Sequence, residues 1–295
     1  MNNVDIGTCS WTEKTLLQSK EFYPSTVKTA QERLKFYASH FSTVEVDSAY
    51  YALGNERNST LWAQRTPDNF IFHIKVYSAL TGHGASIQSI PKDIEPFIEK
   101  EVKFKKQVYI KSRALIEELG RRFVSALEPL RQASKLGLLV FQFPPWFQYS
   151  QDNLNYILFC KDLVIGLKVG VEFRHASWLL LKRRDTILQF LKSHGLTYIS
   201  ADEPQYGNMA TIPFIPGATT DTAYVRLHGR NKENWLKKGI ETSLRYSYLY
   251  SDSELRDISS HVKKLAQKAQ KVYVMFNNCH GGFAMRNALS MKELV

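Results

Sequence analysis

Two stretches of the chain alternate ionisable or ring side chains with apolar ones, which could gather several reactive groups in one place. They are Val171-Glu172-Phe173-Arg174-His175 and Tyr224-Val225-Arg226-Leu227-His228-Gly229-Arg230. Alternation at every second position is typical of a β-strand, whose successive side chains point to opposite faces. Parallel strands are normally covered on both faces and apolar throughout, so this alternation indicates a shared polar interior. Carboxylate, imidazole and guanidinium groups together could transfer protons and bind an anion.

Eight short runs have strand composition, and helical periodicity fills most of the gaps between them. The runs are residues 4–9, 43–47, 70–76, 137–143, 169–174, 196–201, 222–228 and 271–277. A capping box of Ser251 and Glu254 opens one helix, and a final helix is expected from Ala284 to Val295. Eight alternations that end in a helix predict an α/β fold, a single (β/α)8 TIM-like barrel over residues 1–295. An open doubly wound sheet is the alternative.

One gap departs from this plan. Residues 203–221 contain Pro204, Gly207, Pro213, Pro216 and Gly217, so the barrel is expected to lack one regular covering helix between its sixth and seventh strands. Two long loops, residues 77–112 and 229–251, follow the third and seventh strands. In a barrel they would lie on the face that carries catalytic residues.

Strand alternation assigns a set of polar side chains to the barrel interior. These are Glu45, Asp47, His73, Lys75, Gln142, Glu172, Arg174, Ser200, Asp202, Arg226, His228 and Asn277. Buried charges must pair with one another, because an isolated one costs several kcal/mol, roughly. Barrel centres are normally apolar, so this interior favours a site, and a polar plug without a ligand is the alternative.

The predicted roles follow from side-chain chemistry. Glu172 and His228, with Glu45, are the candidate catalytic residues for proton transfer. Arginine and lysine suit an anionic ligand, and aromatic residues after strands suit a ring, although such aromatics can also wedge loops in place. The predicted ligand-binding residues are Lys75, Arg174, Asp202, Arg226, Arg230, Asn277, Asn278, Trp11, Tyr51 and Trp178.

Other chemistries remain open at this point. Glu45, Glu172, Asp202 and His228 could hold a divalent metal, but no HxH or HExxH spacing is present and the arginines would compete, so no cofactor is predicted. Lys75 could form a Schiff base, and Cys9 or Cys279 could be nucleophiles. The loop at 277–282 could bind phosphate or be a glycine turn.

Composition limits the class of protein. Lys and Arg number 39 against 28 Asp and Glu, a net charge of +11, which fits an anionic ligand or simple solubility. A nucleic-acid partner is left open and is not favoured. Three cysteines without CxxC spacing indicate no disulfide framework. The start of the sequence does not resemble a signal peptide and no 18-residue apolar run occurs, so a cytoplasmic protein without a membrane partner is expected, of unspecified oligomeric state.

These segments resemble the YecE-like family, also called domain of unknown function 72, across nearly the whole chain. The motifs are Gly7-Thr8 with Trp11, Phe22-Tyr23-Pro24, Val44-Glu45-Val46-Asp47-Ser48 with Tyr51, Thr66-Pro67 with Lys75, Val171-Glu172-Phe173-Arg174-His175 with Ser177-Trp178, Arg226-Leu227-His228-Gly229-Arg230, Asn277-Asn278 and Asn287-Ala288. The resemblance implies a TIM barrel and no settled activity. Members usually have asparagine at the position of Asp47, proline at Ala176, and Ser-Gly at Cys9-Ser10.

The leading hypothesis is therefore an enzyme, a hydrolase, lyase or isomerase, that uses acid and base chemistry. Its substrate would be small, anionic and cyclic, such as a sugar phosphate or a nucleotide. The rival hypotheses are a non-catalytic module that binds a phosphorylated ligand or nucleic acid, and a purely structural role.

Overall fold

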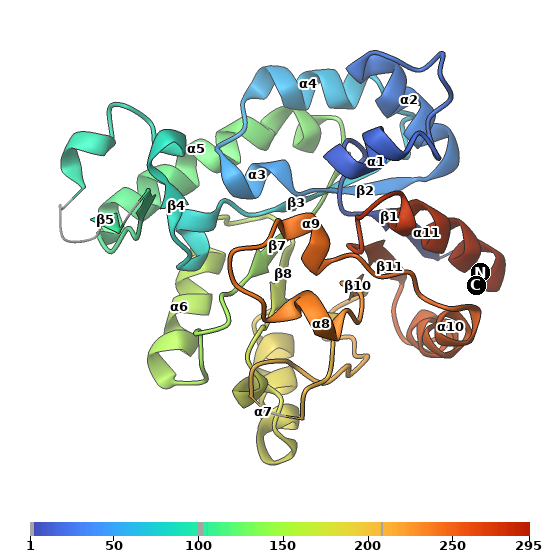
Figure 1. Cartoon of the computed structure of the whole chain (residues 1–295). Helices are drawn as coiled ribbons and strands as arrows, with labels where there is room; N and C mark the ends of the chain where they lie inside the picture. The colour runs from blue at the N-terminus through green and yellow to red at the C-terminus, as the bar shows by residue number, and fades with distance from the viewer. Residues whose placement is uncertain (1–2, 99–102, 105, 208) are drawn as a thin grey trace.

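The computed structural model describes residues 3–98, 103–104, 106–207 and 209–295, and its centre is an eight-stranded parallel sheet (Figure 1). The strands are β1 (Val4–Thr8), β2 (Thr43–Val46), β3 (Ile71–Lys75), β7 (Leu136–Gln142), β8 (Val169–Glu172), β9 (Thr197–Asp202), β10 (Thr222–Leu227) and β11 (Lys271–Phe276). Their order in the sheet is β1-β11-β10-β9-β8-β7-β3-β2. The predicted strands and the (β/α)8 TIM-like barrel are confirmed, and the doubly wound alternative is wrong.

The sheet comes close to closing where its two end strands, β1 and β2, meet. Cys9 forms an isolated parallel bridge with Glu45, and the amide of Ser10 donates to the Glu45 carbonyl at 2.9 Å. Gly7 allows the approach, because a Cβ built there would lie 2.4 Å from the carbonyl oxygen of Thr43. The first strand therefore delivers the Cys9 thiol to the side of Glu45.

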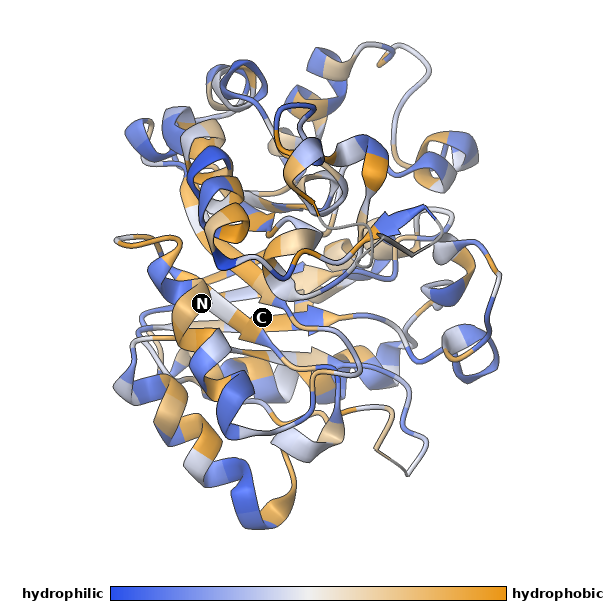
Figure 2. Cartoon of the chain, turned by 90° about the vertical axis from the view of Figure 1, so that its left-hand side faces the viewer, coloured by the Kyte–Doolittle hydropathy of each residue, from blue (hydrophilic) through white to orange (hydrophobic). Residues whose placement is uncertain are grey.

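Helices surround the strands (Figure 1). They are α1 (Lys14–Ser19), α2 (Ala30–His40), α3 (Ser48–Tyr51), α4 (Glu56–Gln64), α5 (Arg113–Gln132), α6 (Gln151–Asp162), α7 (Leu181–Ser193), α8 (Lys232–Trp235), α9 (Thr242–Arg245), α10 (Asp252–Ala266) and α11 (Phe283–Leu294). The predicted capping box opens α10, and Figure 2 shows covering helices that are part apolar and part hydrophilic. In the described residues, no helix has both the length and the apolar character that crossing a membrane requires.

Three segments differ from a regular barrel. The described residues of 203–221 form no helix, as predicted, and the Thr219 hydroxyl holds this segment to β9 by donating to Leu196 O at 2.6 Å. After β3, a small antiparallel sheet of β4 (Ala85–Ser86), β5 (Lys103–Phe104) and β6 (Gln107–Val108) extends to one side (Figure 1). The segment after β10 carries α8 and α9 across the carboxyl ends of the strands.

The barrel interior has an apolar layer beneath a polar layer at the carboxyl ends of the strands. Leu138, Val140, Ile199 and Met275 belong to the apolar layer. The position of Ile199 corrects the predicted facing of the sixth strand. Gly170 on β8 leaves room for the Ile199 side chain, whose Cδ1 would be 2.9 Å from a Cβ at that glycine.

The facing of the whole β9 strand therefore differs from the prediction. Tyr198 packs in the outer core, and Ser200 Oγ accepts a hydrogen bond from the amide of Gly217. Ser200 and Asp202 point away from the interior, so their predicted placement is wrong. The next residue, Glu203, reaches the interior side and pairs with Arg174.

Candidate functional site

Arg226 on β10 is the central cation of the polar layer. Its side chain is fully buried, and Nη1 lies 2.5 Å from Glu172 Oε2 while Nη2 lies 2.5 Å from Glu45 Oε1. Asp47 Oδ1 is 3.7 Å from the same Nη2. One guanidinium thus joins carboxylates from β2 and β8 across the barrel, in a planar geometry that lysine could not reproduce.

Glu172, at the end of β8, is an anchored carboxylate. Its Oε1 accepts from Gln142 Nε2 at 2.7 Å and lies 2.9 Å from His228 Nε2, and Arg174 Nη1 is 3.5 Å away. Burial raises the pKa of Glu172, but Arg226, His228 and Arg174 outweigh it and hold that pKa well below its usual range. Glu172 therefore stays ionised at neutral pH.

His228 is held neutral with both ring nitrogens engaged. Asn277 Nδ2 can only donate, so it donates to His228 Nδ1 at 2.8 Å, and the Nε2 proton faces Glu172. Burial lowers the pKa of His228 to about 4, although Glu172 opposes the shift. The structure brings the predicted catalytic pair Glu172 and His228 together, and each holds the other in a fixed orientation. Their role in proton transfer remains a prediction.

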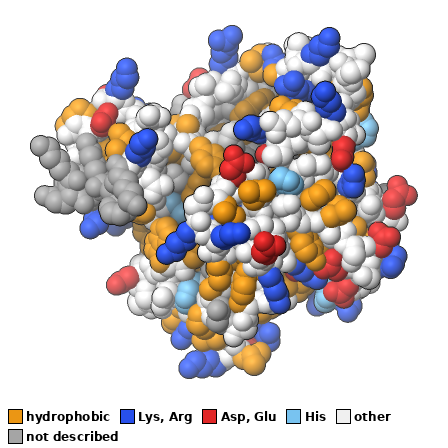
Figure 3. Space-filling view, viewed as in Figure 1, with side chains coloured by type: hydrophobic (Ala, Val, Ile, Leu, Met, Phe, Trp, Pro, Cys, Tyr) orange, Lys and Arg blue, Asp and Glu red, His pale blue; other side chains and the backbone are white. Residues whose placement is uncertain are grey.

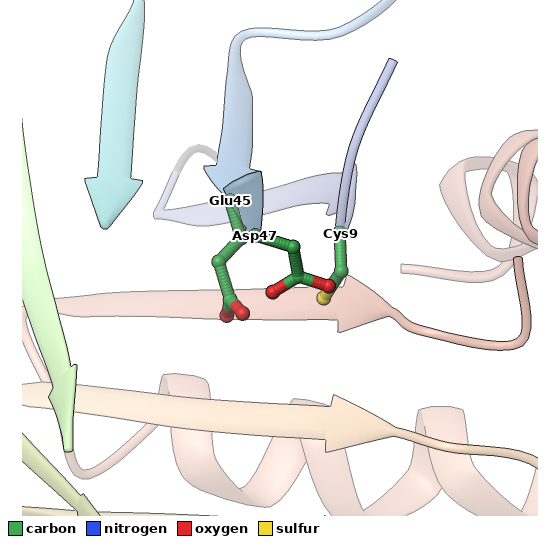
Figure 4. A group of neighbouring side chains, drawn as sticks. All are labelled: Cys9, Glu45 and Asp47. Carbon is green, nitrogen blue, oxygen red and sulfur yellow. The ribbon is translucent and has the colours of Figure 1, made fainter. Parts of the chain in front are cut away.

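Glu45 differs from Glu172 because a second carboxylate adjoins it. Figure 4 shows the carboxyl groups of Glu45 and Asp47 and the thiol of Cys9 directed toward one another. Tyr224 donates its hydroxyl to Glu45 Oε2 at 2.8 Å. Burial raises the pKa of Glu45 to about 7, with Arg226 lowering it and Asp47 raising it. Asp47 is 22% exposed, and its Oδ1 has no hydrogen-bond partner among the described residues.

The cluster of Cys9, Glu45 and Asp47 has donor atoms for a metal, all within 4.8 Å of one another. However, Arg226 Nη2 lies 2.5 Å from Glu45 Oε1, 3.7 Å from Asp47 Oδ1 and 3.8 Å from Cys9 Sγ. The guanidinium is thus a cation that this cluster already contacts, and it would compete with a divalent metal there. The metal set considered from sequence is also not assembled, because Asp202 faces outward.

Arg174 and Lys75 add positive charge at the mouth of the barrel. Arg174 Nε lies 2.9 Å from Glu203 Oε2, and its guanidinium lies over the Trp235 ring at 5.1 Å. Lys75 is 8% exposed with Nζ 4.4 Å from the centre of the Tyr50 ring. Among the residues that the structure describes, Lys75 Nζ has neither a carboxylate partner nor a hydrogen-bond acceptor.

Glu203 is a site residue that the sequence analysis missed. Its side chain is buried, Oε1 accepts from the amide of Ile212 at 2.7 Å, and burial raises its pKa to about 7 while Arg174 lowers it. The sequence did contain a signal for Glu203, because Asp202 and Glu203 are adjacent acids and only one of two neighbouring strand residues can face the interior.

Three predicted ligand-binding residues lie on the outer side of the polar layer. Asp202 accepts from Arg230 Nη2 at 2.9 Å, and Arg230 Nη1 also reaches Glu254 at 3.1 Å. Asn278 Nδ2 donates to Tyr248 O at 2.8 Å. These contacts fix the segment after β10 to β9, β11 and α10, and they do not reach the interior carboxylates.

Of the three predicted aromatic ligand-binding residues, two are buried and one is exposed. Trp11 packs edge-on to Trp62 at 5.8 Å, and Trp178 is fully buried against Phe173 at 4.4 Å. Neither presents a ring face at the mouth. Tyr51, on α3 directly after β2, is 60% exposed.

Comparison with known proteins agrees with this fold. The family model described as protein of unknown function DUF72 matches residues 5–295. UPF0759 protein YunF of Bacillus subtilis (strain 168) is 34% identical over 295 residues, covering 98% of this chain and 94% of that protein.

Solved structures of two relatives show the same arrangement. A DUF72 family protein from Enterococcus faecalis V583 has a TM-score of 0.81 at 29% identity, covering 99% of this chain and 94% of that one. A DUF72 family protein from Thermotoga maritima MSB8 has a TM-score of 0.78 at 30% identity, covering 99% and 98%. The expected family is confirmed: this chain belongs to the DUF72 family of proteins of unknown function.

Proposed function

We propose that the protein is an enzyme that applies acid and base chemistry to a small anionic substrate at the carboxyl ends of the barrel strands. The observation that carries the proposal is the Glu45 carboxyl, which is fully buried, bound to Arg226 and adjacent to Asp47. With a pKa of about 7, it can hold or release a proton near neutral pH.

The neighbours of Glu45 suit this role. Tyr224 and Arg226 fix its two oxygens, and Asp47 offers a more exposed carboxylate next to it. A proton can therefore pass between the buried Glu45 and a group at the mouth through Asp47. Glu172 and His228, which the sequence analysis favoured for proton transfer, act in this proposal by orienting Arg226.

Lys75 and Arg174 supply the charge that an anionic substrate needs. When Glu45 and Glu203 are protonated, the cations Lys75, Arg174 and Arg226 face two carboxylates, Glu172 and Asp47. When both are ionised, the same three cations face four. Anion binding should therefore be coupled to proton uptake at these carboxyls.

This coupling predicts a pH dependence for sulfate, an anion that does not titrate near neutrality. The pKa values of Glu45 and Glu203 are raised to about 7, so both gain negative charge as pH rises through 7. We expect sulfate affinity, measured calorimetrically at constant ionic strength, to fall about tenfold from pH 6 to pH 8. Glu203→Gln should weaken the dependence, whereas Glu21→Gln, at the surface ion pair with Arg286, should leave it unchanged. An affinity that does not vary with pH would contradict the coupling.

The enzyme proposal itself is tested by turnover. A panel of sugar phosphates and mononucleotides is incubated with the purified protein and followed by phosphorus and proton NMR. We expect conversion of at least one compound, with catalysis lost in Glu45→Gln. If the wild-type protein converts none of them, the proposal is wrong.

The observations favour a small ligand over nucleic acid. Figure 3 shows Lys and Arg interspersed with Asp and Glu on the pictured face, without the single-sign stripe that binding to a phosphate backbone favours. The non-catalytic and structural alternatives predict no turnover in the same experiment.

A further inference from the structure

We propose that the mouth contains an aromatic subsite, formed by Tyr51, Tyr50, His83 and Trp146, that stacks the base of a mononucleotide whose phosphate lies at Lys75. This inference rests on the proposed function, because it names the class of substrate for the same site. These four rings are called the aromatic row below.

Ring contacts connect the aromatic row from end to end. Tyr51 and Tyr50 are 5.1 Å apart, Tyr50 and His83 are 5.3 Å apart, and His83 and Trp146 are 5.7 Å apart, all in edge-to-face geometry. Its members come from α3, from the segment after β3 and from the segment after β7. All three segments leave the carboxyl ends of neighbouring strands, so the row borders the mouth.

Both ends of the row are open to solvent. Tyr51 is 60% exposed and Trp146 is 58% exposed, while Tyr50 and His83 between them are partly buried. A single exposed aromatic side chain needs no explanation. Because neighbouring rings of the row are edge-on to one another, a base can stack on the face of one exposed ring at an end of the row, such as Trp146, beside the buried cation Lys75.

The anionic end of the ligand is placed by Lys75. Its Nζ is 4.4 Å from the Tyr50 ring, at the centre of the row. A second buried lysine among the described residues, Lys135, has a fully satisfied ammonium, since its Nζ donates to Ala63 O, Thr66 O and Thr66 Oγ1. Lys75 Nζ has no hydrogen-bond acceptor among the described residues, so its three N–H donors are available to a phosphate.

The aromatic row suits a nucleobase better than it suits a sugar ring. His83 is neutral near pH 7, because burial, then Lys75 and Arg174, lower its pKa to about 3. Its Nδ1 bonds to Thr81 Oγ1 at 2.8 Å, and Nε2 has no partner in the described part of the chain, so this nitrogen can meet the edge of a base. A sugar platform also needs acceptors for several hydroxyls, and arginines already pair with most of the carboxylates here.

The test compares three ligands in a series that adds first a ribose and then a base to phosphate. Affinities of inorganic phosphate, ribose 5-phosphate and adenosine 5′-monophosphate are measured by calorimetry on the full chain. We expect the adenosine compound to bind about tenfold or more tightly than ribose 5-phosphate, the range that one stacked base supplies. Trp146→Ala should remove that difference and leave ribose 5-phosphate binding unchanged. Lys75→Met should weaken all three ligands.

Phe97→Ala is the matched control, because Phe97 is 72% exposed and its ring contacts no member of the aromatic row. It should change none of the affinities. Equal affinity of the wild-type protein for the two ribose compounds would overturn the subsite and leave the anion site standing. An advantage of the adenosine compound that survives both Trp146→Ala and Tyr51→Ala would also overturn it. Failure of all three ligands to bind would instead contradict the proposed function.

Discussion

Replacing Arg226 with methionine is expected to lower the free energy of unfolding by about 3–5 kcal/mol at pH 7.5. The side chain is fully buried and joins Glu45 to Glu172, so the substitution leaves two buried carboxylates without their cation. Methionine fills a similar volume, which keeps the contribution of a cavity small. Urea unfolding followed by circular dichroism measures the change.

The loss of unfolding free energy in the Arg226→Met protein should become smaller as pH falls. In the wild-type protein the pKa of Glu172 lies below its unfolded value, so its ion pairs contribute stability above about pH 4.5 and lose it in acid. Without Arg226 much of that contribution is lost at neutral pH, although Arg174 still lies 3.5 Å from Glu172, and the two carboxyls protonate more readily as pH falls. The difference between variant and wild type should therefore shrink between pH 7.5 and pH 5.

Arg286→Met is the control, because Arg286 pairs with Glu21 on the surface, where both side chains are about half exposed. It should cost less than about 1 kcal/mol. Adding Glu172→Gln to Arg226→Met should recover part of the loss, since one fewer carboxylate is then unpaired. A loss below about 1 kcal/mol for Arg226→Met would show that the carboxylates have another source of compensation.

The interior strands that were predictable from sequence are those whose apolar positions are unambiguous. Val225 and Leu227 flank Arg226, and Val171 and Phe173 flank Glu172. Their hydrophobicity fixes which face meets the helices, so the ionisable residues between them can only face inward.

The β9 strand lacks that contrast. Tyr198, Ile199 and Ala201 are all compatible with either face, so alternation within the strand does not decide its orientation. The deciding contact lies on another strand, where Gly170 leaves space for Ile199. A local pattern cannot contain that information, and the prediction therefore chose Asp202 in place of Glu203.

The aromatic residues show a similar limit. Trp178 and Trp146 both follow strands, yet the first stacks on Phe173 in the core and the second is 58% exposed. Tryptophan has a large apolar area and a polar N–H, so it suits both environments. Only the packing of the loops distinguishes them, and this packing decides which rings a ligand can reach.

The same distinction separates charged groups that hold the site from groups that can act. His228 has both nitrogens engaged, and Glu172 accepts from several donors at once, so a proton exchange at either residue would break hydrogen bonds that hold Arg226 and Glu172 in place. Glu45 has a pKa of about 7 and a more exposed neighbour in Asp47. Acid and base chemistry is therefore expected to depend most on Glu45.

Glu45→Gln is expected to reduce kcat by about 10²- to 10⁴-fold for a compound that the wild-type protein converts. KM should stay the same or fall, because the neutral glutamine resembles the protonated Glu45 that favours anion binding. Glutamine keeps the volume and can still accept from Tyr224, but it cannot gain or lose a proton. Steady-state kinetics on the converted compound, with unfolding curves to confirm that the variant folds, measure the effect. Turnover that persists in a folded Glu45→Gln protein would exclude Glu45 as the proton-transfer group.

Asp47→Asn separates this role from a general disturbance of the site. The negative charge of Asp47 raises the pKa of Glu45, so removing it should lower that pKa from about 7. The limb of the kcat profile that reports Glu45 should then move to lower pH, in addition to any loss of kcat at every pH from removing the proton path through Asp47. A substitution that only loosened the site would lower kcat without moving the limb. A limb that stays in place would mean that the titrating group lies elsewhere, because the charge adjacent to Glu45 has been removed.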